Sequence, residues 1–182
     1  MRSITLAAAG VLAATAVLGA GSPALAEDVP APEVQWVNGN VVVNPTDPTA
    51  ATVVARYRCY GGPNHLWVSV KQGEHLGDEA HAAELTEQYA DQLPPGEVIG
   101  PFSSFLADAW ADTNYLFDPN VGPLAQADCD GEWHTDRVTV RSVDGFDALS
   151  KGAAWVQFCL YTAGGFATNE GWRTVKSAVG KA

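Results

Sequence analysis

The sequence predicts a mostly β fold, an antiparallel sandwich of two sheets interrupted by one inserted segment. Apolar and polar residues alternate with a period of two near both ends of the chain. The apolar runs stop at turns containing Gly or Pro, and strands do not alternate with helices, which argues against a parallel sheet. This combination is typical of the immunoglobulin-like sandwich, and the same pattern also allows a small barrel.

Three strands are predicted before residue 73. A short apolar run, 41–43, stops at Asn44-Pro45. In the run from Thr52 to Cys59, alternation assigns every second side chain to the core: Val53, Ala55, Tyr57 and Cys59. After a turn at 61–64, the third strand places Leu66, Val68 and Val70 in the core and Trp67, Ser69 and Lys71 on the opposite face.

Three more strands are predicted after residue 131. The strand 133–143 directs Val138 and Val140 inward. The run 153–162 is apolar on both faces, as expected for a central strand, with Val156, Phe158 and Leu160 inward and Trp155, Gln157, Cys159 and Tyr161 outward. Gly164-Gly165 forms a turn, and residues 172–179 form the last strand.

Residues 73–128 break the alternation and are predicted to be an insertion between the third strand and the strand that Cys129 precedes. From Asp78 to Leu93, the spacing of Leu85, Tyr89 and Leu93 predicts an amphipathic helix, which ends at Pro94-Pro95-Gly96. The segment 102–117 is rich in aromatic residues, and its pattern fits either a helix or an irregular loop.

The first 26 residues have the pattern of a secretory signal peptide. Arg2 precedes an apolar run, and Ala24-Leu25-Ala26 is a typical cleavage site. We therefore expect a secreted, extracellular protein, with an N-terminal leader over 27–40 and the β domain over 41–182. No later run is long and apolar enough to span a membrane.

The expected mature chain is strongly acidic. Without Arg2 it carries nine Lys+Arg against 21 Asp+Glu, a net charge of −12. Such a surface repels phosphate groups, so nucleic acids and anionic membranes are not expected as partners.

The three cysteines of the mature chain predict one disulfide and one free thiol, because an exported chain meets oxidising conditions. Cys59 ends one strand, and Cys129 stands just before its predicted antiparallel neighbour, so the two can meet without distortion. Alternation directs Cys159 outward. We therefore predict the pair Cys59–Cys129 over the alternative, Cys59–Cys159.

No catalytic residue, metal site or cofactor is predicted. His75 and His81 stand among carboxylates, but no zinc-binding spacing is present, and the segment is interpreted as a solvated acidic helix. His134 and Asp136 share a strand face, yet no serine is associated with them as a nucleophile. We therefore do not expect an enzyme.

Four aromatic side chains are predicted to gather on one outer face of the sheet: Trp67, Trp155, Tyr161 and Trp172. If open, such a face would stack on sugar rings or other flat ligands. In the favoured interpretation, the insertion covers at least two of the three tryptophans, with its own apolar residues packed on them: Leu85, Tyr89, Leu93, Phe105 and Trp110.

Four segments resemble a group of small uncharacterised secreted actinobacterial proteins: Tyr57-Arg58-Cys59, His65-Leu66-Trp67-Val68, Cys129-Asp130-Gly131-Glu132-Trp133-His134 and Ala154-Trp155-Val156-Gln157-Phe158-Cys159-Leu160. The resemblance extends from Val41 to Lys176. It implies export and an immunoglobulin-like β domain, and it implies no activity.

The sequence thus predicts a secreted, non-catalytic domain whose specific role it does not define: the domain binds a ligand, with a glycan or a protein as the candidates, or stabilises the cell exterior. The alternative is a small extracellular hydrolase that uses acidic residues of the insertion. A concave pocket with two carboxylates or a His–Asp pair would favour the hydrolase.

Overall fold

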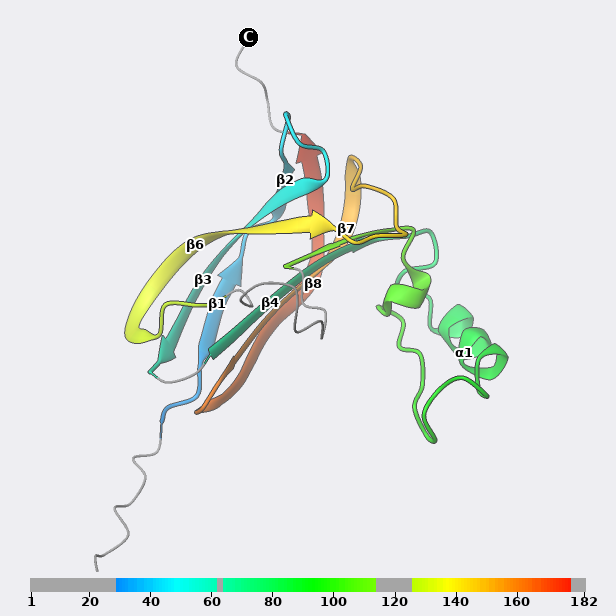
Figure 1. Ribbon diagram of the computed structural model, residues 1–182, viewed down its shortest axis with the longest axis horizontal. Coiled ribbons are helices and arrows are strands. Elements are labelled where there is room, and N and C mark those ends of the chain that lie inside the picture. Colours follow the sequence, from blue (N-terminus) through cyan, green and yellow to red (C-terminus); the bar gives the residue numbers. More distant parts are fainter. Residues whose placement is uncertain (1–28, 62–63, 114–125, 178–182) are drawn as a thin grey trace, which may run out of the picture.

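The computed structural model describes residues 29–61, 64–113 and 126–177 (Figure 1). Within them the elements follow one another as β1 (Glu33–Val37), β2 (Asn40–Val43), β3 (Ala50–Tyr60), β4 (Asn64–Gln72), α1 (Glu79–Gln88), a 3-10 helix (Ser104–Leu106), β5 (Ala109–Asp112), β6 (Asp130–Ser142), β7 (Gly152–Thr162) and β8 (Gly165–Ser177). The predicted signal peptide, 1–26, lies outside the described residues. None of the described helices is long and apolar enough to cross a membrane.

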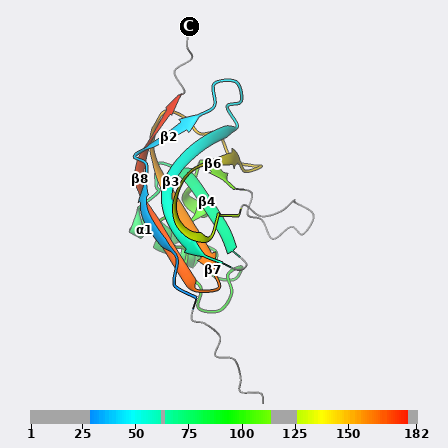
Figure 2. The ribbon, with the colours of Figure 1, turned by 90° about the vertical axis from the view of Figure 1, so that its left-hand side faces the viewer.

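The sheet closes into a seven-stranded barrel, so the prediction of an immunoglobulin-like sandwich is wrong. From β3 the pairings run through β2, β8, β7, β4, β5 and β6, and β6 pairs again with β3 (Figure 2). The strands β2 and β8 are parallel, and the other pairings of named strands are antiparallel. A sandwich keeps two sheets with separate edges, whereas here the β2–β8 pairing and the strand β5, which pairs with both β4 and β6, join what would be edges.

Two strands went unrecognised in the sequence. The first, β5, pairs with β4 on one side and β6 on the other, and it thereby connects the two halves of the barrel. Its four residues, Ala-Trp-Ala-Asp, are too few to display alternation, and they lie in the segment 102–117 that fitted either a helix or a loop. The second, β1, lies within the predicted leader, 27–40, and pairs with β3 beyond the end of β2.

The barrel interior contains the side chains that alternation assigned to the core, which confirms that part of the prediction. Along β3, buried and partly exposed residues alternate without a break from Ala51 to Tyr60. One continuous apolar core includes the predicted inward residues of four strands: Val53, Ala55, Tyr57, Leu66, Val68, Val70, Val138, Val140, Val156, Phe158 and Leu160. Alternation therefore identified the inner faces of β3, β4, β6 and β7 correctly.

The insertion forms a second, smaller core on the outside of the barrel. Its helix α1 is capped by Asp78, whose Oδ1 accepts hydrogen bonds from the backbone N–H groups of Ala80 and His81. The helix ends at Gln88, earlier than the predicted Leu93. The fully buried residues of the second core are Leu76, Ala82, Ile99 and Leu106. Figure 1 shows α1 and the 3-10 helix together on one side of the barrel.

The predicted disulfide is confirmed. Cys59 and Cys129 are bonded, with their Cα atoms 4.5 Å apart, and Cys159 is a free, buried thiol. The reason is the predicted one, because β3 and β6 are antiparallel neighbours and the pair Tyr60–Asp130 lies next to the bridge. The bridge thus ties the end of one long strand to the start of the next strand in the barrel.

Candidate functional site

The outer face of β5, β4, β7 and β8 carries its side chains in four cross-strand rows, because antiparallel partners stand directly opposite one another. The tryptophan row consists of Trp110, Lys71, Trp155 and Trp172. The polar row consists of Asp112, Ser69, Gln157 and Glu170. The Trp67 row contains Trp67, Cys159 and Thr168, and the hairpin row contains His65, Tyr161 and Phe166. The four predicted aromatic residues therefore share one face, spread over three rows.

The insertion covers one end of this face. The ring of Phe102 stacks on that of Trp155, with centroids 3.6 Å apart and planes 7° from parallel. Phe102 also meets the edge of Trp172, at 6.1 Å, but Trp172 remains 48% exposed. The residues expected to cover the face have three different positions. Leu85, Tyr89 and Leu93 pack on the second core, and Phe105 is exposed. Trp110 belongs to β5, where it contacts Phe146. The cover is therefore centred on Trp155.

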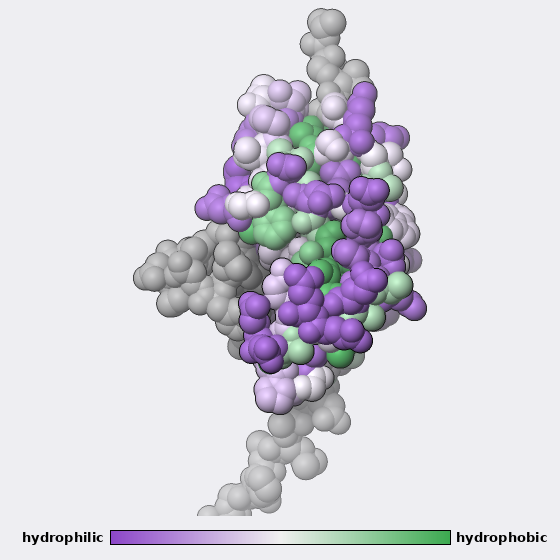
Figure 3. All heavy atoms as spheres, turned by 90° about the vertical axis from the view of Figure 1, so that its right-hand side faces the viewer, coloured by the Kyte–Doolittle hydropathy of each residue, from purple (hydrophilic) through white to green (hydrophobic). Residues whose placement is uncertain are grey.

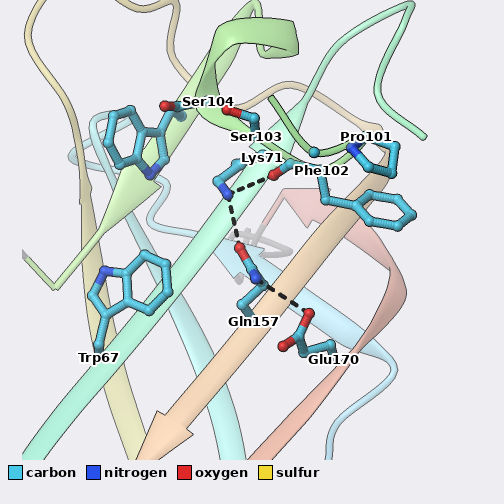
Figure 4. Close-up of a pocket in the computed structure, with 10 residues that line it drawn as sticks. Trp67, Lys71, Pro101, Phe102, Ser103, Ser104, Gln157 and Glu170 are labelled. Carbon is cyan, nitrogen blue, oxygen red and sulfur yellow. Dashed lines mark hydrogen bonds between the residues drawn. The ribbon is translucent and has the colours of Figure 1, made fainter. Parts of the chain in front are cut away.

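Beside this cover lies a groove of about 500 Å³ between the sheet and the insertion. The sheet contributes Trp67, Lys71, Trp110, Gln157 and Glu170, and the insertion contributes residues 100–104. Figure 4 shows Trp67 on one side of the groove, with Gln157 and Glu170 on neighbouring strands. Seen from the side of the insertion, the surface has apolar patches bordered by hydrophilic residues (Figure 3).

Lys71 is the central charged group of the groove. Its Nζ donates hydrogen bonds to the backbone oxygen of Phe102 and to Oε1 of Gln157, both at 2.7 Å. Gln157 in turn donates from Nε2 to Oε2 of Glu170, at 3.2 Å (Figure 4). Lys71 is only 5% exposed, and this burial lowers its pKa to about 8 although Glu170, Cys159 and Asp112 favour the charged form. An ammonium has three N–H donors, so one remains after these two bonds.

Within the described residues, the fully buried polar side chains lie on the two strands beside the groove. The polar and charged residues that are fully buried, Ser69, Lys71 and Asp112, are neighbours on β4 and β5. Within the described part of the structure, Ser69 Oγ and Trp110 Nε1 are buried and have no hydrogen-bond partner. Burying polar groups without partners costs free energy, and such groups call for an explanation beyond folding. The groove is therefore the strongest candidate for a binding site.

Cys159 lies beneath the same face but lacks the features of a reactive thiol. It is 3% exposed and stands between Trp67 and Thr168. Burial raises the pKa of its thiol, and the nearest polar contact is Thr168 Oγ1, at 3.7 Å. A buried thiol that remains protonated is a poor nucleophile, so we assign Cys159 a packing role.

The groups considered for catalysis do not come together. His134 contacts Asp130, with Nε2 2.7 Å from Oδ1, while Asp136 accepts a hydrogen bond from the Tyr57 hydroxyl. The His134–Asp136 pair, which the sequence analysis considered and did not adopt, is therefore not formed. The acidic residues of the insertion near α1 are exposed and do not line the groove: Glu74, Asp78, Glu79 and Glu84.

The remaining histidines of the insertion also form no metal site. The rings of His75 and His81 lie 4.2 Å apart, and His81 approaches Glu84 at 3.5 Å. Within the described ranges, no group of three or more potential ligands is placed to hold a metal ion.

Of the groove residues, Trp67 was predicted to belong to an aromatic binding face and Trp110 to cover it, whereas Lys71 and Gln157 were placed outward without a role. Alternation directed Ser69, Lys71 and Gln157 outward, on the face of the tryptophans. Glu170 was missed because the last strand was predicted to begin at 172, whereas β8 begins at Gly165. The signal that could have pointed to the groove is a polar residue that faces outward beside tryptophans facing outward from the adjacent strands.

The protein is a small closed β barrel with a groove between its outer surface and the insertion. No family model, curated protein or solved structure matches the chain. The resemblance to secreted actinobacterial proteins stays a prediction.

Proposed function

We propose that the protein is a secreted, non-catalytic binding protein that holds a neutral carbohydrate in the groove. The observation that carries this proposal is the presence of two tryptophans, Trp67 and Trp110, together with Lys71, Gln157 and Glu170 in one concave surface. A sugar ring has an apolar face that packs on aromatic rings and hydroxyl groups that bond to amides and charged groups. The groove offers both kinds of contact on adjacent strands.

Charge favours a neutral sugar over an acidic one. The expected mature chain carries a net charge of −12, and Glu170 places a carboxylate at the groove itself. Lys71 is linked to Glu170 through Gln157, so its positive charge is already partly balanced. An anionic ligand would meet repulsion at long range and at the site.

The lining of the groove supports binding without cleavage. Among the described residues that line it, Glu170 supplies the one carboxylate. Glycosidases generally use two carboxyl groups on either side of the bond that breaks. The Gln157 amide, placed between Lys71 and Glu170, instead provides a fixed donor and acceptor for recognition.

The proposed location outside the cell rests on two features. The signal-peptide pattern of residues 1–26 predicts export. The Cys59–Cys129 disulfide supports it, because such bonds form and persist in oxidising compartments.

The proposal is tested by ligand binding to residues 27–182, with calorimetry and a panel of neutral oligosaccharides. Trp67→Leu keeps apolar bulk but removes the flat ring, and the loss of the ring should weaken binding about fivefold, since an aromatic stacking contact contributes roughly 1 kcal/mol. Trp36→Leu is the matched control, because Trp36 is an exposed tryptophan on β1, outside the four rows. Equal affinity of Trp67→Leu and wild type would contradict the proposal.

A further inference from the structure

A second pocket lies on the same face, beyond Trp67. Its volume is about 360 Å³, and it is lined by Asn64, His65, Tyr161, Thr162 and Ala163. Tyr161 is 44% exposed, and its ring centroid lies 6.1 Å from that of His65. This pocket therefore has an accessible aromatic ring and uncharged polar groups.

The hairpin row extends the aromatic surface of this pocket. Phe166, across the β7–β8 pair from Tyr161, is 51% exposed, and the two ring centroids are 4.8 Å apart. Large aromatic side chains left in contact with water on a defined patch are a common mark of a binding surface.

The second pocket and the groove lie along one line of the sheet. On β7, Gln157 of the groove and Tyr161 of the second pocket are four residues apart and point to the same face. At a rise of about 3.3 Å per residue, they are separated by roughly 13 Å along the strand. Trp67, which stands opposite Cys159, lies between them.

The second pocket is also held firmly in place. The turn between β7 and β8 contains only Ala163 and Gly164. A Cβ atom at Gly164 would meet the backbone oxygen of Pro30 at 2.1 Å, so the N-terminal segment packs closely against the turn. A rigid pocket loses little conformational freedom when it binds a ligand.

Building on the proposed carbohydrate function, we infer that the hairpin row forms a second sugar subsite and that the natural ligand is a linear oligosaccharide. Asn64 and Thr162 line the second pocket beside the exposed Tyr161 ring. The Asn64 amide exchanges two hydrogen bonds with the backbone of Ala127 and keeps one further N–H donor, while the Thr162 hydroxyl bonds within the turn. Among the described residues, the lining includes no Asp, Glu, Lys or Arg, which suits a neutral chain. Because Trp67 connects the two pockets, a chain of several sugar units would contact both, whereas a disaccharide would fill one.

Calorimetry with two pairs of probes tests this inference: cellobiose with cellohexaose, and chitobiose with chitohexaose. We expect one of the hexasaccharides to bind at least tenfold more tightly than its disaccharide. Tyr161→Ala should remove most of that gain and leave disaccharide affinity unchanged, while Tyr161→Phe, which keeps the ring, should bind like wild type. Trp67→Leu should weaken both probes.

The outcomes separate the subsite from the proposed function. If disaccharide and hexasaccharide bind equally well, or if Tyr161→Ala binds the hexasaccharide like wild type, the second subsite is wrong and the groove proposal stands. If wild-type protein binds none of the four probes, the proposed function and the subsite both fail for these sugars. Circular dichroism of Tyr161→Ala identifies a folding defect, and Phe166→Ala then serves as the second test of the hairpin row.

Discussion

Replacing Lys71 with methionine should change the way in which stability depends on pH. Lys71 is 5% exposed, and its pKa is about 8 in the folded protein, against the ordinary value of 10.5 in the unfolded chain. Between these two values the unfolded chain holds the proton more tightly than the folded protein does. Raising the pH through this window therefore favours the folded state of the wild type.

The size of this effect follows from the two pKa values. Each pH unit between them corresponds to about 1.4 kcal/mol, so the full effect is roughly 3 kcal/mol. Below pH 8 the folded wild type contains a buried ammonium, which lowers its free energy of unfolding. Between pH 8 and 10.5 this destabilisation disappears. The free energy of unfolding of wild type minus that of Lys71→Met should therefore rise by about 2–3 kcal/mol from pH 7 to pH 10.

Guanidinium unfolding at pH 7 and pH 10 measures this difference, and the subtraction cancels groups that titrate equally in both proteins. Both proteins should carry Cys159→Ser, because a thiolate at high pH can attack the disulfide. Lys176→Met is the matched control, since Lys176 is an exposed lysine on β8. A wild-type-minus-Lys71→Met difference that stays constant with pH would refute the reasoning that burial disfavours the Lys71 ammonium.

Two further predictions concern the disulfide and the histidine near it. Cys129→Ser should lower the free energy of unfolding by about 4 kcal/mol, because the bridge closes a loop of 70 residues, while Cys159→Ser should have a much smaller effect. Denaturant unfolding of the two variants checks this, and equal losses would contradict it. The Asp130 carboxylate raises the pKa of His134 above its ordinary value of 6.5. The resulting stabilisation is present below pH 6.5 and is lost as the pH rises through the raised pKa. An NMR titration should show a raised midpoint that Asp130→Asn returns toward 6.5, and a midpoint that Asp130→Asn leaves unchanged would contradict this assignment.

Local pattern was enough to determine the long strands and their inner faces. Alternation in β3, β4 and β7 placed residues such as Tyr57, Val68 and Phe158 in the core, where the structure has them. The reason is that successive side chains of a strand point to opposite sides, so a strand with one buried face has an apolar side chain at every second residue. The disulfide needed one further assumption, that the strands ending at Cys59 and following Cys129 are antiparallel neighbours, and this pairing occurs in the barrel as it would in the expected sandwich.

Closure of the barrel was decided only in the tertiary structure. It depends on β5, whose four residues show no periodicity, and on the pairing of β2 with β8. These contacts are backbone hydrogen bonds between distant segments, and the alternation of side chains does not specify which segments pair. Sandwich and barrel therefore share one alternation pattern, and strand pairing chooses between them.

The candidate site divides in the same way. The sequence by itself determined that Trp67, Lys71 and Gln157 point to the outer face. Only the tertiary structure decided that Phe102 of the insertion stacks on Trp155 and leaves a groove beside it. The pKa of Lys71 was beyond the sequence as well, because it depends on what surrounds the ammonium in three dimensions. Side-chain direction is a local property of the backbone, whereas burial and solvation are set by segments far away in the chain.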